Sequence, residues 1–213
     1  MKAVGILGSA RYNGNTAQFL DAALAGAQEG GAQIKRYDLY TLKYTGCVSC
    51  FACKRIGGAS HGRCAVSDDL KPVLDDVLTA DLLFIASPVY FGDVTGEVRS
   101  FLERLWFPGL LYRRDGAVSY DRHLKVGLLY TMNVEDPIEC GYSSLFEQNQ
   151  RICEAYLGKT QTIWAADTCQ FDDYSKYDSS VFDSEHKQLM RKEKFPEDLR
   201  TAHNFGFNLA RSI

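Results

Sequence analysis

The sequence has no surplus of basic residues and no apolar run long enough to cross a bilayer. Lysine and arginine together number 24, against 27 aspartate and glutamate residues, which leaves a formal net charge of -3. A general nucleic-acid binder needs a cationic surplus to neutralise phosphates, so the charge balance argues against that class. The longest apolar run, at residues 81–89, is much shorter than a membrane-spanning helix and predicts a buried strand.

The first residues also lack the cleavage site of a signal peptide, because Met1–Leu7 leads directly into a strand pattern. We therefore expect a cytoplasmic protein with no membrane partner. Seven cysteines are many for that compartment, their number is odd, and four of them lie within residues 47–64. Metal or redox chemistry explains this distribution better than a disulfide framework. The scattered Cys140, Cys153 and Cys169 are expected to be buried as small apolar side chains.

Short apolar segments alternate with segments of helical periodicity along the whole chain. Strands are expected at residues 3–7, 33–39, 82–86, 125–130 and 160–166. Helices are expected at residues 15–29, 92–105 and 145–157, after the cap Asp68-Asp69, and from Pro196 onward. This alternation predicts a parallel sheet with right-handed crossovers and helices on both faces.

The length of 213 residues suits one domain, 1–213, built on five strands. Five strands in a doubly wound α/β protein suit the flavodoxin-like order 2-1-3-4-5, in which ligands bind beyond the carboxyl ends of the strands. Two stretches are predicted as additions to this core. One is a Cys-rich insertion loop at 45–66, and the other is a polar extension at 167–195.

A loop rich in polar side chains follows the first predicted strand and ends at a predicted helix. Its hydroxyl, amide and guanidinium donors are Ser9, Arg11, Asn13, Asn15 and Thr16. Backbone N–H groups at a helix N-terminus favour a bound phosphate, and these side chains can add donors and a positive charge. The loop matches neither the G-x-G-x-x-G pattern nor the P-loop. An ordinary helix-capping turn is the alternative, and the position after the first strand favours phosphate.

The third predicted strand ends in an aromatic loop. Tyr90 and Phe91 can pack against a planar ring such as a flavin, and Gly92 leaves an open backbone N–H. The same two aromatic side chains could instead close the top of the sheet. A phosphate loop beside them favours the cofactor interpretation.

The segments 8–16, 87–90 and 96–105 resemble those of the NAD(P)H-dependent FMN reductase branch of flavodoxin-like proteins. The resemblance covers 1–166 and the last helix. It implies FMN as cofactor, with phosphate contacts from Ser9, Arg11, Asn15 and Thr16. It also implies ring contacts from residues 88–92, which are Pro88, Val89, Tyr90, Phe91 and Gly92. By location alone, Thr131, Met132 and Asn133 fall where the family's third cofactor loop lies.

The resemblance further implies an oxidoreductase that takes electrons from NAD(P)H as co-substrate, or from a redox partner, and passes them through FMN to a second acceptor. No catalytic side chain is expected, because the flavin carries the chemistry. The partners implied are small molecules or ferredoxin-type proteins, together with a second copy of the chain in a homodimer or homotetramer. A pure electron carrier without an NAD(P)H site is one alternative.

The remaining motif is C-x2-C-x2-C at Cys47, Cys50 and Cys53, followed by Cys64. Three thiolates at this spacing can surround one iron–sulfur cluster. The motif resembles that of the iron–sulfur flavoprotein subgroup, which implies a [4Fe-4S] cluster near the FMN of a neighbouring subunit. It implies as an alternative function an electron carrier between ferredoxin and an acceptor through FMN and this cluster. Ten residues separate Cys53 from Cys64, more than the subgroup's compact spacing. Zinc, reduced thiols and a redox disulfide therefore remain alternatives, as does a zinc-stabilised module without enzymatic activity.

Overall fold

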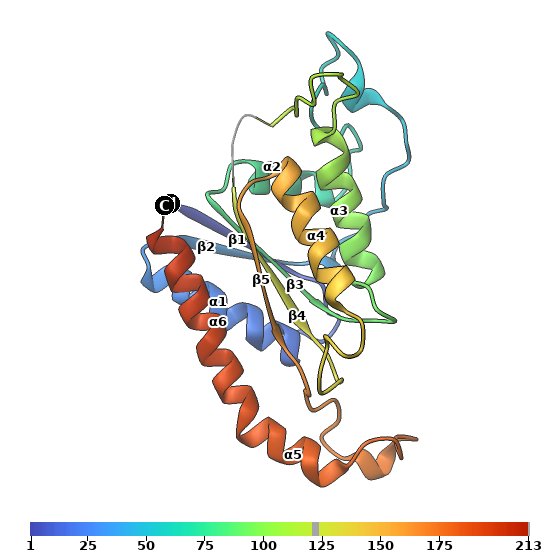
Figure 1. The fold of residues 1–213 in the computed structure, drawn as a ribbon. Coiled ribbons are helices and arrows are strands. Elements are labelled where there is room, and N and C mark those ends of the chain that lie inside the picture. Colours follow the sequence, from blue (N-terminus) through green and yellow to red (C-terminus); the bar gives the residue numbers. More distant parts are fainter. Residues whose placement is uncertain (121–123, 213) are drawn as a thin grey trace.

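A computed structural model describes residues 1–120 and 124–212 of the chain (Figure 1). Its centre is one parallel sheet of five strands in the order β2-β1-β3-β4-β5. The strands are β1 (Lys2–Leu7), β2 (Gln33–Asp38), β3 (Leu82–Pro88), β4 (Lys125–Thr131) and β5 (Thr160–Ala165). The predicted flavodoxin-like sheet and its order are thus confirmed.

Burial across the sheet explains why its strands differ in composition. All residues of β3 are buried, since helices cover both faces of this central strand, and its sequence is accordingly almost wholly apolar. The edge strands β2 and β5 are partly exposed and carry polar residues. Parallel pairing places the carboxyl ends of the strands along one edge, where the loops that follow them meet.

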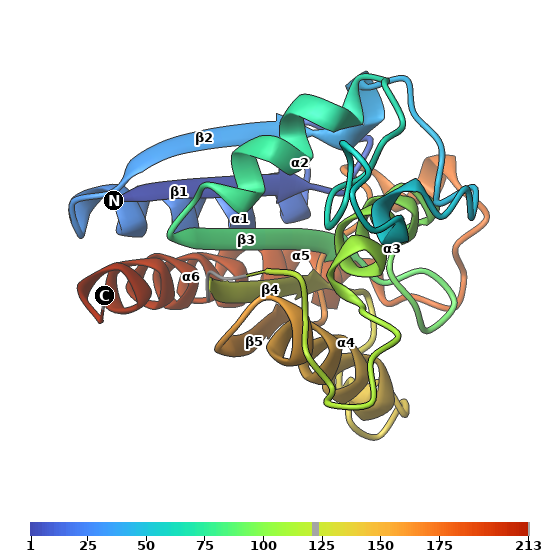
Figure 2. The ribbon, with the colours of Figure 1, turned by 90° about the horizontal axis from the view of Figure 1, so that it is seen from above.

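Helices form a layer on each face of the sheet (Figure 2). One layer contains α1 (Asn15–Glu29) and α6 (Lys194–Arg211), and the other contains α2 (Leu70–Leu78), α3 (Gly96–Gly109) and α4 (Ser143–Tyr156). A further helix, α5 (Ser184–Lys192), precedes α6, and short 3₁₀ turns lie at Leu39–Thr41, Ala52–Lys54 and Tyr174–Lys176. None of the helices in the described part of the chain is both long and apolar enough to span a membrane.

Two glycines allow α1 and α6 to pack with their backbones in direct contact. A Cβ atom added to Gly206 would lie 1.9 Å from the carbonyl oxygen of Ala23, and one added to Gly26 would lie 1.9 Å from that of His203. Any side chain at either position would therefore collide with the opposing backbone. The close crossing seals this face of the sheet over the buried strands β1 and β3.

Three sequence-based details need correction. Helix α3 begins at Gly96 instead of residue 92, because Thr95 is its N-cap and accepts a hydrogen bond from Val98 N. Of the predicted cap Asp68-Asp69, only Asp68 receives a hydrogen bond from α2, since its Oδ1 accepts from Leu70 N at 3.2 Å, whereas the Asp69 carboxylate accepts from Lys43 N. The polar extension contains helix α5, which is capped by Asp183. This helix has too few apolar residues for its periodicity to be recognised in the sequence.

Candidate functional site

The loops after β1, β3, β4 and β5 surround a cavity beyond the carboxyl ends of the strands. Its walls are formed by Arg11, Asn15, Pro88, Val89, Tyr90, Phe91, Thr131, Met132, Asn133, Thr168 and Gln170. Eight of the twelve residues predicted as cofactor contacts therefore line one cavity; Met132 also joins them there. We call it the cofactor cavity.

The other predicted contacts lie close to the cavity without lining it. Ser9 is buried, and its Oγ accepts a hydrogen bond from Arg11 N at 3.2 Å. The Thr16 hydroxyl is buried and pairs with that of Thr131 at 2.7 Å. This pair joins the start of α1 to the end of β4, so Thr16 helps to hold together two of the loops that surround the cavity. Asn13 lines a neighbouring cavity, and Gly92 lies in the turn after β3.

The aromatic loop after β3 is a tight turn. Tyr90 and Asp93 exchange two backbone hydrogen bonds, of 2.8 and 3.0 Å, and the two residues between them have positive φ angles. Those angles, 52° at Phe91 and 78° at Gly92, are typical of a type I′ turn. The turn places Phe91 at the tip with its side chain fully exposed. A broad aromatic face is thus presented at the mouth of the cavity.

Hydrogen bonds at the start of α3 hold this turn against the sheet. The Thr95 hydroxyl donates to Gly8 O at 2.9 Å, and Thr95 N donates to Ser87 Oγ at 3.1 Å. Gly8 must lack a side chain because a Cβ atom there would lie 2.0 Å from Val98 Cγ2. The ends of β1 and β3 are therefore locked together beneath the cavity.

The loop after β5 is a fourth cofactor-cavity loop that the sequence did not reveal. Thr168 and Gln170 line the cavity, and Asn133 Nδ2 donates to Gln170 Oε1 at 2.5 Å. Asn133 Oδ1 is buried and has no partner among the described residues. A flavin offers an N–H donor on its pyrimidine edge, so this unsatisfied acceptor fits such a ligand. No motif marks this loop; only its place after β5 could have indicated it.

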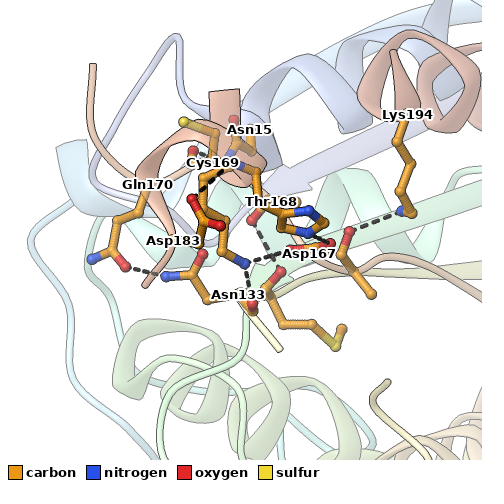
Figure 3. A network of polar contacts seen from close by, with 12 residues as sticks. Asn15, Asn133, Asp167, Thr168, Cys169, Gln170, Asp183 and Lys194 are labelled. Atoms are coloured by element: carbon orange, nitrogen blue, oxygen red, sulfur yellow. Dashed lines mark hydrogen bonds and ion pairs between the residues drawn. The ribbon is translucent and has the colours of Figure 1, made fainter. Parts of the chain in front are cut away.

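The extension after β5 is attached to the cofactor loops by a buried ionic network (Figure 3). Lys187 of α5 is buried, and its Nζ contacts Asn133 O at 2.7 Å and Asp167 Oδ1 at 2.5 Å. His186 Nε2 lies 2.7 Å from the other carboxylate oxygen of Asp167. Burial opposes ionisation of Asp167, but the hydrogen bonds from Lys187 and His186 outweigh it and lower the pKa of this carboxyl.

Lys187→Met is expected to loosen the attachment of the extension and to lower the free energy of unfolding. Removing the ammonium leaves Asp167 with His186 alone, at a cost of about 2 kcal/mol in the free energy of unfolding. In the native protein the lowered pKa of Asp167 adds stability above the ordinary aspartate range, near pH 4, and this is lost as the pH falls. Without Lys187 the pKa of Asp167 is depressed less, so the variant should lose less stability than the native protein as the pH falls.

Denaturant titrations from neutral pH down to about 3.5 measure both effects. Lys192→Met, on the exposed side of the same helix, is the matched control and should change stability little. Equal stability of the two variants at neutral pH would contradict the assigned role of Lys187.

The four clustered cysteines line a second cavity beside the C-terminal half of α3. Cys47, Cys50, Cys53 and Cys64 share its wall with Glu103, Arg104 and Phe107. The predicted metal-binding residues are thus gathered around one space, although 10 residues separate the last two in sequence. We call it the cysteine cavity. In Figure 1 the loop that carries these cysteines lies beside the end of α3 that points away from the extension.

Two cations and a constrained backbone surround these thiols. Arg104 Nε donates to Cys64 Sγ at 2.9 Å, and Lys54 Nζ donates to the carbonyls of Phe107 and Leu110. Ser49 and Phe51, on either side of Cys50, have φ angles of 51° and 56°. Non-glycine residues adopt this conformation only where other contacts require it. The loop thereby curls around the cavity.

Burial raises the pKa of Cys53, and the nearby Lys54 charge only partly opposes this. A metal or cluster at this position would therefore have to displace a proton from the thiol on binding. No three of the four sulfur atoms lie within 4.8 Å of one another, since the only such donor group in the described residues is Glu135, Asp167 and His186. A tetrahedral zinc ion needs a tighter arrangement of its ligands than this one.

The three scattered cysteines differ in exposure. Cys153 and Cys169 are buried as predicted, and burial raises the pKa of Cys153 to about 12. The prediction for Cys140 is wrong, because this residue is exposed. Cys140 lies in the turns before α4, where its N–H donates to Asp136 O and its side chain faces outward.

The sheet order, with a cavity beyond the carboxyl ends of its central strands, defines a flavodoxin-like protein. The NAD(P)H:quinone oxidoreductase from Methanothermobacter marburgensis superposes with a TM-score of 0.70 at 16% sequence identity, over 98% of both chains. An azoreductase from Bacillus anthracis str. Sterne superposes with a TM-score of 0.65 at 15% identity, over 100% of both chains. These likenesses confirm the fold.

The chain belongs to the NADPH-dependent FMN reductase family, whose model matches residues 1–123. An iron-sulfur flavoprotein from Archaeoglobus fulgidus is 35% identical over 105 residues, which cover 49% of this chain and 46% of that protein. The chain thus spans about half the length of the curated relatives that it matches. The predicted family resemblance is confirmed.

Proposed function

We propose that the protein is an FMN-dependent oxidoreductase that accepts electrons from NAD(P)H and passes them to a second acceptor. The observation that carries this proposal is the cofactor cavity, in which three loops predicted from sequence meet a fourth at the switch point of the sheet. Membership in the NADPH-dependent FMN reductase family supports the same cofactor and donor.

The residues of the cavity divide into two groups by chemistry. Arg11 and Asn15, beside the N-terminus of α1, would hold the phosphate, together with backbone N–H groups at that terminus. Tyr90, Phe91 and Asn133 would hold the ring, by packing and by accepting a hydrogen bond at Asn133 Oδ1. When bound, FMN supplies hydride acceptance and electron transfer. The chain's own task is to orient the ring and leave one face open to a nicotinamide.

The first test is a visible spectrum of the purified protein, followed by an NADPH oxidation assay. We expect flavin absorbance, one FMN per chain on extraction, and steady NADPH oxidation in the presence of a quinone or another artificial acceptor. A protein that binds FMN but oxidises neither NADPH nor NADH would be an electron carrier instead. Failure to bind added FMN would exclude the proposed function.

We further propose that the cysteine cavity holds a [4Fe-4S] cluster. Four cysteines around one space, two neighbouring cations and sulfur separations too large for one zinc ion support this proposal. The relatives that match about half of the chain's length are iron-sulfur flavoproteins, which agrees with this proposal. The cluster would let the protein exchange single electrons with a ferredoxin-type partner.

Iron and sulfide analysis of anaerobically purified protein tests the cluster. About four irons per chain are expected in the native protein, and most of them should be lost in Cys50→Ser. Cys140→Ser is the control, because Cys140 is exposed and lies outside the cysteine cavity. Stoichiometric zinc in place of iron, or equal iron in both variants, would refute this assignment.

The positions of the two cavities also support a homo-oligomer. The cofactor cavity lies at the start of α3, whereas Arg104 and Phe107 of the cysteine cavity lie two to three turns further along the helix, about 12–17 Å from its first residue. We therefore propose that a second copy brings its cysteine cavity toward the flavin of the first. Size-exclusion chromatography with light scattering would distinguish a dimer or tetramer from a monomer.

A further inference from the structure

A third cavity, distinct from the cysteine cavity, adjoins the cofactor cavity on the side of the phosphate loop. Arg11, Asn15 and Gln170 line both this cavity and the cofactor cavity, and Asn13, Asp172 and Arg191 line the third cavity alone. Arg191 belongs to α5 and Asp172 to the loop before it, so the extension forms one wall of this space. Two guanidinium groups thus border the region where the phosphate loop leads into α1.

The charges around this space favour an anion. Arg11 NH1 donates to the carbonyl of Gln170 at 2.9 Å, and Arg11 has no carboxylate partner among the described residues. Arg191 pairs with Asp172, whose side chain is 89% exposed. Exposed pairs of this kind are weak, whereas guanidinium–phosphate contacts are charge-assisted and frequently bidentate. A phosphate can therefore compete with Asp172 for Arg191.

Helix α5 is held in an orientation that keeps Arg191 at this position. Lys187, four residues earlier, is buried against Asp167 and Asn133. Residues four apart lie on the same face of a helix, so the face that carries Lys187 toward the cofactor loops also carries Arg191. The Asn15 side chain further donates to Cys169 O at 2.9 Å, which joins the extension to the phosphate loop.

We propose that Arg191 is a second phosphate-binding arginine, which contacts the FMN phosphate together with Arg11. This inference rests on the proposed function, and it makes the extension a part of the cofactor site. Loss of Arg191 removes one charge-assisted contact that only a phosphorylated flavin can make.

The test compares FMN with riboflavin, which has the same ring system and no phosphate. Cofactor-free protein is titrated with each flavin, and binding is followed by quenching of flavin fluorescence. Arg191→Met is expected to raise the Kd for FMN about tenfold or more while changing the Kd for riboflavin less than about twofold. The melting temperature of the cofactor-free variant should equal that of the native protein.

Arg200→Met is the matched control, because Arg200 is exposed on α6 and pairs with Glu197. It should leave FMN binding unchanged. The inference is overturned if Arg191→Met leaves FMN affinity intact, if it weakens both flavins equally, or if it lowers the melting temperature of the cofactor-free protein. Failure of the native protein to bind FMN would instead refute the proposed function, and the two failures are thus distinguishable.

Discussion

Gly206→Ala is expected to lower the free energy of unfolding by about 3 kcal/mol or more. The added Cβ atom would lie 1.9 Å from Ala23 O, and that oxygen belongs to a helix backbone that no side-chain rotation can move aside. Helices α1 and α6 would have to separate along their contact. This separation would also disrupt the packing of the two helices over β1 and β3.

Gly96→Ala provides the matched control for this prediction. Gly96 is also helical, but a Cβ atom there has open space around it, with no atom within 4 Å. The same substitution at this position should be neutral or slightly stabilising, because it reduces the entropy of the unfolded chain. Chemical denaturation of both variants measures the difference. A Gly206→Ala midpoint within error of the native one would show that the two helices can separate without cost.

Arg104→Met is expected to cost about 3 kcal/mol or more in the free energy of unfolding, because it leaves the half-buried carboxylate of Asp68 without its cation. The Arg104 side chain is 0% exposed, and its guanidinium contacts both carboxylate oxygens of Asp68, at 2.8 and 3.0 Å. The same group donates to Thr45 O and Val66 O, on either side of the Cys-rich loop. The variant should therefore also release this loop.

The stability lost in Arg104→Met should become smaller as the pH falls. Hydrogen bonds from Arg104 lower the pKa of Asp68, so this pair stabilises the fold above the ordinary aspartate range and stops doing so as the pH falls. The native protein and Arg104→Met should thus differ most at neutral pH and converge below about pH 4. Parallel denaturant titrations at several pH values measure this. If the two proteins differed in free energy of unfolding by the same amount at all pH values, the lost stability would come from packing and not from the ion pair with Asp68.

Arg99→Met is the control on the same helix. Arg99 pairs with Asp93 near the surface, where both side chains are partly exposed. Such pairs contribute at most about 1 kcal/mol. A loss comparable to that of Arg104→Met would contradict the distinction between buried and exposed pairs drawn from the structure.

The fold was predictable because each strand pattern is local. Apolar runs such as that of β3, separated by amphipathic helices, identify a doubly wound sheet without tertiary information. Helix α5 escaped prediction because its stability comes from a cap at Asp183 and from the buried Lys187, which are not apolar signals. Cys140 was wrongly predicted as buried, since a residue type alone does not determine its exposure.

The candidate site was predictable where a loop carries distinctive residues. The loops with Arg11 and Asn15, and with Tyr90 and Phe91, do so and meet in one cavity. Arg191 did not stand out, because it lies about 180 residues from Arg11 and only the folded chain brings them to a common space. The role of Arg104 was hidden for the same reason, since its partners Thr45 and Asp68 lie 59 and 36 residues away in the sequence.

The contacts of Arg104 have a consequence for how this protein can change over evolution. Arg104 on α3 donates to Thr45 O and Val66 O, at the two ends of the Cys-rich loop, so the residues between these two contacts can be exchanged without disturbing them. Residues can be added to this stretch at little cost, because loop-closure entropy rises only slowly with length. The ten residues between Cys53 and Cys64 lie within this stretch. The Cys-rich loop can change in length while the sheet beneath it stays the same.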